Sequence, residues 1–142
     1  MVIKRLFLIL IISVLGACSQ LQSNEDHPNM DQITIEQIEN KLTEKGLKLE
    51  ESDLPSDNVF IQQLNNVNPI VYFIDGKILS IYLFSNEQER EKGMLDFEEK
   101  TATAELVSHK IYAIQNILVY YVDGNEVTTN KIYDAMNQLN EQ

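Results

Sequence analysis

The chain has 142 residues, of which 44% are hydrophobic, and this is enough apolar material for one domain of about 110 residues. Its 22 acidic and 11 basic residues give a formal net charge of −11 at pH 7. Nucleic-acid binding depends on Lys and Arg side chains that neutralise phosphates, so this charge argues against it. A single cysteine excludes an intrachain disulfide framework.

Residues 1–17 have the pattern of an export signal. Lys4 and Arg5 precede an uncharged apolar run from Leu6 to Leu15, and small residues follow. This run is too short for a permanent membrane span, which needs about 20 apolar residues. An ordinary cleaved signal peptide and a buried N-terminal helix are alternative interpretations. The buried helix would need a larger core than this chain supplies.

The four residues Leu15-Gly16-Ala17-Cys18 resemble the lipobox of bacterial lipoproteins. The resemblance implies that Cys18 receives a diacylglycerol thioether and that the signal is cleaved between Ala17 and Cys18. It also implies a protein anchored by lipid to the extracytoplasmic face of the cell membrane. Two or three acyl chains hold a protein firmly there, at about 0.8 kcal/mol per buried methylene. The rest of the chain resembles small uncharacterised lipoproteins of Gram-positive bacteria, which adds no defined role.

The mature chain that this cleavage would leave is strongly acidic. The signal contains two of the eleven basic residues and none of the 22 acidic ones, so the mature charge is 9 − 22 = −13. Residues 18–31 are polar, contain one proline and show no apolar periodicity, which predicts a flexible tether. Residues 32–142 are predicted to form a single domain. Its acidity disfavours flat association with anionic lipids, and it is equally compatible with a role in solubility alone.

The predicted domain begins with a helix. Thr34 and Gln37 form a capping-box pair, and an apolar face follows over residues 35–45. An edge strand, a turn and a segment that is ambiguous between strand and helical turn are expected next, at residues 47–51, 54–58 and 59–67.

A β-hairpin is predicted around Asp75-Gly76, a dipeptide suited to a type I′ turn with positive φ at both positions. Its strands are residues 70–74 and 77–84. The register pairs Phe73 with Ile78, Tyr72 with Leu79, and Ile70 with Ile81. Both faces of this hairpin are apolar, so each face is expected to be covered.

A charged helix is predicted after this hairpin. Ser85 and Asn86 offer caps, and the helix is expected to end near Phe97. Met94 and Phe97 lie on its inner face. Gly93 inside it costs about 1 kcal/mol relative to alanine, which favours close packing on the sheet as the reason for its presence.

A second hairpin and a last helix complete the pattern. Residues 109–114 and 117–122 flank Gln115-Asn116, where asparagine tolerates the left-handed region. Thr128 or Thr129 is expected to cap the last helix. Its predicted core stripe consists of Ile132, Tyr133, Met136 and Leu139.

This order is a ββα unit used twice after an N-terminal helix. It predicts an α+β fold: a two-layer domain with an antiparallel sheet of four or five strands and helices packed on it.

No cofactor or metal site is predicted. The sequence has neither a G-x-S-x-G nor an S-x-x-K pattern for a hydrolase nucleophile. His109 is interpreted as an ordinary strand residue. It and His27, which lies in the tether, are too few for a zinc site. The chain also lacks a calcium loop and a glycine-rich phosphate loop.

Three carboxylates leave a catalytic alternative open. Asp96, Glu98 and Glu99 lie close together in sequence. A glycosidase needs two carboxyl groups about 5 to 9.5 Å apart across a cleft, so these residues are the candidates for a carboxylate-dependent envelope hydrolase. A small-ligand-binding lipoprotein that feeds a transporter is a third option, for which two lobes are usual and this chain is short.

Tyrosines are concentrated in the hairpins. Strand packing is the favoured explanation of Tyr112, Tyr120 and Tyr121, and an interface is the alternative, because tyrosine is also enriched where proteins meet. The leading hypothesis is a lipid-anchored, extracytoplasmic, non-catalytic domain. Its partners are membrane lipid, through Cys18, and an unknown protein or cell-envelope component.

Overall fold

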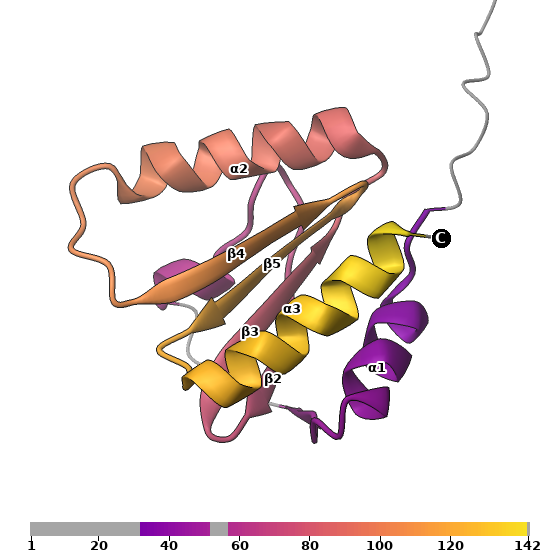
Figure 1. The fold of residues 1–142 in the computed structure, drawn as a ribbon. Helices are drawn as coiled ribbons and strands as arrows, with labels where there is room; N and C mark the ends of the chain where they lie inside the picture. The colour runs from indigo at the N-terminus through magenta and orange to yellow at the C-terminus, as the bar shows by residue number, and fades with distance from the viewer. Residues whose placement is uncertain (1–31, 52–56, 142) are drawn as a thin grey trace, which may run out of the picture.

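The computed structural model describes residues 32–51 and 57–141. Within these residues, five strands form one antiparallel sheet in the order β1-β2-β3-β5-β4 (Figure 1). The strands are β1 (Glu50–Glu51), β2 (Ile70–Ile74), β3 (Lys77–Leu83), β4 (His109–Ile114) and β5 (Ile117–Val122). The helices are α1 (Ile35–Glu44), α2 (Glu87–Thr101) and α3 (Glu126–Asn140), with a 3-10 turn at Val59–Ile61.

Helices cover both faces of this sheet (Figure 1). Helices α1 and α3 pack on one face, and α2 packs on the other together with the segment around Phe60 and Leu64. The predicted α+β class, the antiparallel sheet and the repeated ββα order are confirmed. The layers number three rather than the expected two, because both faces of the central strands are apolar and each must be covered.

The first hairpin has the predicted register. Phe73 pairs with Ile78, and Asp75 and Gly76 both adopt positive φ, at 53° and 73°. In the second hairpin the left-handed residue is Gln115, at φ 44°, and not the asparagine that was expected to tolerate it. The side chain of Asn116 is instead buried and makes hydrogen bonds of its own.

The remaining elements near the start of the domain follow the sequence pattern closely. The capping box of Thr34 and Gln37 is present at the start of α1. The expected edge strand is reduced to β1, which pairs with β2. The ambiguous segment 59–67 contains the 3-10 turn and an isolated bridge between Leu64 and Val67. Of the turn predicted at 54–58, residues 54–56 lie outside the described residues.

Two helix boundaries differ from the prediction. Helix α2 starts after its N-cap Asn86 as expected, but it continues beyond Phe97 to Thr101, whose hydroxyl donates to the Phe97 carbonyl at 2.7 Å. The N-cap of α3 is Asn125, whose Oδ1 accepts from the Thr128 N–H at 2.9 Å. Asparagine caps a helix at least as well as threonine, and this displaces the start of α3 toward the N-terminus.

The core stripe of α3 is also partly different from the expected one. Ile132, Met136 and Leu139 are buried with Ala135, but the side chain of Tyr133 is 55% exposed. Successive helical residues are about 100° apart, which places Tyr133 beside the stripe instead of in it.

Candidate functional site

The predicted lipidation and cleavage residues, Ala17 and Cys18, lie outside the described residues. At the start of the described chain, Gln32 bonds to the Ser85 carbonyl after β3, and Ile33 meets the β4–β5 turn. The Ile33 N–H donates to Asn116 Oδ1 at 2.9 Å, and Asn116 Nδ2 donates to the Ile33 carbonyl at 3.1 Å. Asn116 Nδ2 also donates to the Phe84 carbonyl at 3.3 Å. One buried side chain therefore joins the N-terminal segment, the end of β3 and the second hairpin.

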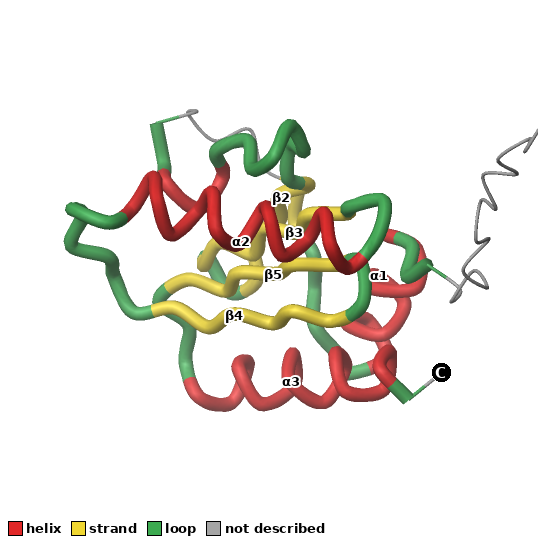
Figure 2. Tube along the Cα trace, turned by 90° about the horizontal axis from the view of Figure 1, so that it is seen from above, coloured by secondary structure: helices red, strands yellow, loops and turns green. Residues whose placement is uncertain are grey.

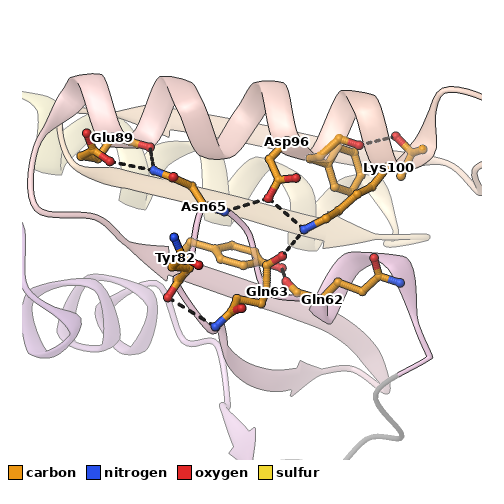
Figure 3. Close-up of polar contacts among 10 residues, drawn as sticks. Gln62, Gln63, Asn65, Tyr82, Glu89, Asp96 and Lys100 are labelled. Atoms are coloured by element: carbon orange, nitrogen blue, oxygen red, sulfur yellow. Dashed lines mark hydrogen bonds and ion pairs between the residues drawn. The ribbon is translucent and has the colours of Figure 1, made fainter.

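Asp96 belongs to a polar cluster between α2 and the segment that precedes β2 (Figure 3). Its Oδ2 accepts from the Asn65 N–H and from Lys100 Nζ, each at 2.8 Å. Asn65 Nδ2 donates to Glu89 Oε2 at 2.8 Å, and Lys100 Nζ donates to the Gln63 carbonyl at 2.6 Å. These contacts attach the segment to the side of α2.

The charge state of this cluster suits a structural role. The Lys100 ammonium, and then the Asn65 N–H, hold the pKa of Asp96 below its ordinary value. The Lys92 ammonium and the Asn65 amide lower the pKa of Glu89 in the same way. A general acid needs a raised pKa, so the environment of Asp96 is the opposite of the one that this half of a hydrolase pair requires.

The other two predicted carboxylates do not face Asp96 across a cleft. Glu98 and Glu99 are both exposed on α2. Asp96 and Glu98 are two residues apart on the helix, so their side chains leave its axis about 200° apart. Across the described part of the chain, no group of three or more His, Cys, Asp or Glu residues is arranged to hold a metal ion.

Of the three tyrosines predicted for an interface, two lie inside the domain. Tyr120 packs under α2, with its ring centroid 4.5 Å from that of Phe97, and Tyr121 is buried on the opposite face. Tyr112 is partly buried, and its hydroxyl donates to the Thr129 carbonyl of α3 at 3.3 Å. The interface interpretation is therefore corrected for Tyr120 and Tyr121: alternate residues of a central strand face the two opposite cores.

His109 also has a packing role. Its ring centroid lies 4.9 Å from that of Phe60, and its Nδ1 lies 2.9 Å from the Val107 carbonyl oxygen. The structure thus places this residue at the start of β4, against the aromatic cluster under α2, as a strand residue.

The outer edge of β4 is the surface that sequence reasoning missed. β4 ends the strand order, and no strand within the described residues pairs with its outer side. The Asp123 N–H donates to the Ser108 carbonyl at 2.7 Å, which sets the phase of the antiparallel ladder with β5. Because hydrogen-bonded pairs alternate in such a ladder, the N–H and C=O groups of His109, Ile111 and Ala113 point outward. A terminal strand leaves no mark in a linear sequence, so only the strand order reveals this edge.

Two exposed apolar residues flank this edge on the α2 side. Figure 2 shows α2 running over the sheet alongside β4 and not directly above it. The side chain of Ile111 is 45% exposed, and Ala113 is exposed as well. On α2, the 59% exposed Leu95 belongs to a row of residues at helical spacing, on the side turned away from Asn65. That row consists of Glu87, Glu91, Leu95 and Glu98, and all four are exposed.

Glu98 of this row lies within electrostatic reach of Tyr120 in the core. Burial raises the pKa of the Tyr120 hydroxyl first, and the negative charge of Glu98 raises it further. Tyr120 is the register partner of Ile111. Glu98 is therefore near enough to Tyr120 to act on its hydroxyl, whereas Glu99, one residue further, is about 100° away around the helix.

Comparison with known proteins provides no relative from which a function could be inferred. No family model matches the chain, and the chain has no match among the curated proteins or the solved structures. In the part of the chain that the structure describes, no helix has the length and apolar character needed to cross a membrane.

Proposed function

We propose that this protein is a lipid-anchored, extracytoplasmic, non-catalytic module that binds a protein partner at the cell envelope. The observation that carries the binding role is the open edge of β4, with Ile111 exposed beside it. An exposed strand edge is normally shortened, covered or strongly charged, because it is a template for another chain. β4 is six residues long, carries one lysine and has no proline.

The non-catalytic part of the proposal is supported by the state of the candidate carboxylates. Asp96 is engaged by Asn65 and Lys100, and Glu98 leaves the helix in a different direction. The anchoring part is supported by the resemblance of residues 15–18 to a lipobox. A lipid on Cys18, followed by a polar tether, would hold the domain near the membrane, while the charge of −13 on the mature chain keeps the domain off anionic headgroups.

Metabolic labelling with palmitate tests the anchor directly. The native chain is expected to incorporate label and to sediment with membranes, and the Cys18→Ala variant is expected to do neither. Equal labelling of the two forms would refute anchoring through Cys18.

In-cell crosslinking with mass spectrometry tests the binding role. A discrete partner that is captured from cells with the native chain, and lost with Cys18→Ala, is the expected result. Hydrolysis of an ester, peptide or glycan substrate by the purified protein, abolished by Asp96→Asn together with Glu98→Gln, would overturn the non-catalytic assignment.

A further inference from the structure

We infer that the outer edge of β4 accepts an extended segment of a partner protein as a sixth strand, and that this segment is basic on its α2-facing side. The inference rests on the proposed binding function and names its surface and its partner chemistry. The outward N–H and C=O groups of His109, Ile111 and Ala113 supply the main-chain hydrogen bonds of strand addition. Six residues of strand span about 20 Å, which is enough for a short recognition segment.

The side chains of the added strand alternate between the two faces of the sheet. On the α2 face they meet Ile111, Ala113 and the row of Glu87, Glu91, Leu95 and Glu98 on α2. Two of these glutamates share Arg90, whose guanidinium lies 3.1 Å from Glu87 and 3.7 Å from Glu91. The row therefore remains negative overall, and lysine or arginine on this side of the partner strand complements it.

The opposite face has a different character. The side chains of Lys110 and Tyr112 lie on the α3 side of the sheet, because they alternate along β4 with those of Ile111 and Ala113. Lys110 is exposed, and Tyr112 is partly buried. Tyr133 of α3, one helical turn from the Thr129 that bonds Tyr112, is 55% exposed. Side chains of the partner strand on this face are accordingly expected to be apolar or acidic.

Charge favours a different protein over a second copy of this chain as the occupant. An antiparallel pairing of two β4 strands would bring two rows of carboxylates to the same face of the extended sheet. Each mature chain would also carry −13. Like charges in close apposition oppose association, whereas a basic segment gains from the same field.

Site-specific photocrosslinking in the native host tests this inference on the full chain. The photoreactive residue p-benzoylphenylalanine replaces Ile111 in one strain and Val127 in another. Val127 is a matched control because it is 67% exposed, and its position on α3 is about 200° from that of Thr129, which faces β4. We expect a partner protein to be captured from position 111 and not from 127, and the crosslinked peptide to carry basic residues at alternate positions.

Two matched pairs of variants, each combined with the probe at position 111, test the mechanism. Ala113→Pro removes an outward N–H without removing a bond to β5, whereas Ala113→Ser keeps that N–H. Glu98→Lys and Glu99→Lys change the net charge equally, but only the first alters the row that flanks β4. We expect at least a tenfold loss of crosslinking for Ala113→Pro and Glu98→Lys, and retention for Ala113→Ser and Glu99→Lys. Circular dichroism checks that each variant is folded, and the lysine pair decides the outcome if Ala113→Pro unfolds.

The outcomes separate this inference from the proposed function. Capture from position 127 alone would leave a binding module and overturn the role of the β4 edge. Capture of a second copy of the chain, or of a segment without alternate basic residues, would overturn the partner chemistry. Crosslinking at neither position would overturn both proposals.

Discussion

Asn116 and Ile33 form a reciprocal pair of buried hydrogen bonds, in which the Asn116 amide accepts from the Ile33 N–H and donates to its carbonyl. The contact joins residues 83 positions apart in the chain. It holds the segment before α1 against the β4–β5 turn, at the end of the domain to which residues 1–31 connect. The Asn116 side chain therefore helps to fix the place where the N-terminal segment enters the domain.

Asn116→Ala is expected to lower the free energy of unfolding by about 1–3 kcal/mol, because it leaves buried backbone groups without partners. Urea denaturation of the full chain measures this change. Gln115→Gly at the neighbouring turn position is the control. Glycine adopts the φ of 44° found at position 115 without the strain of a side chain, so this variant is expected to leave stability unchanged or to raise it. Equal losses for both variants would show that the turn as a whole, and not the Asn116 amide, is what matters.

Gly93→Ala is expected to destabilise the protein although alanine is the better helix former. A Cβ at Gly93 would lie 2.3 Å from Cζ of the buried Phe84 ring. The overpacking cost of about 1–3 kcal/mol exceeds the helix-propensity gain of about 1 kcal/mol. Thermal or urea unfolding measures the net effect.

A double-mutant cycle identifies the contact responsible. In a Phe84→Leu background the ring atoms that obstruct the Cβ are gone, so Gly93→Ala is expected to be less costly than in the native background. A cost that is the same in both backgrounds would assign the effect to another neighbour of Gly93.

Asp96→Asn is expected to change how stability depends on acid pH. The folded-state pKa of Asp96 lies below its ordinary value of 3.8, so its carboxylate stabilises the folded state above that pH. This contribution is lost as the pH falls from the ordinary value through the lower folded-state value. The native protein should therefore lose stability over this acid range, and the variant should lose less.

Urea midpoints measured from neutral pH down to about pH 2 test this expectation, because they follow the free energy of unfolding when the slope is unchanged. Glu99→Gln also removes a carboxylate from α2, and within the described residues Glu99 makes no side-chain hydrogen bond or ion pair. An acid profile changed as much by Glu99→Gln as by Asp96→Asn would contradict a specific role for the cluster.

Tyr72 is expected to make an alkaline contribution. Burial, and then the hydrogen bond that it donates to Glu39 of α1, together raise its pKa to about 12. Because the raised value favours the neutral hydroxyl in the folded state, its contribution is present below pH 10 and is lost as the pH rises toward 12. Tyr72→Phe should flatten this part of the stability profile.

Ultraviolet absorbance follows the ionisation of the tyrosines directly. Glu39→Gln keeps an acceptor for Tyr72 but removes the charge. The pKa of Tyr72 should therefore fall, and its part of the absorbance change should move to lower pH. A titration curve that is identical in Glu39→Gln and the native chain would rule out the ion-assisted contact between α1 and β2.

The strongest sequence patterns predicted their local structure well. Asp75-Gly76 dictated both the turn and the register of the first hairpin, because few residues adopt positive φ at two successive positions. Predictions failed where tertiary contacts compete with a local preference. Asn116 was expected to adopt the left-handed conformation, but the burial of its amide against Ile33 places Gln115 there instead.

The sequence by itself determined the α+β class, the repeated ββα order and the need to cover both faces of the sheet, because each depends on the spacing of apolar residues along the chain. Only the tertiary structure decided which side chains meet. The strand order made β4 an edge. Packing on both faces of the sheet placed Tyr120 and Tyr121 in two opposite cores. The helical geometry of α2 directed the side chains of Asp96 and Glu98 to different sides. These outcomes depend on contacts between residues far apart in sequence, which hydrophobic periodicity does not encode.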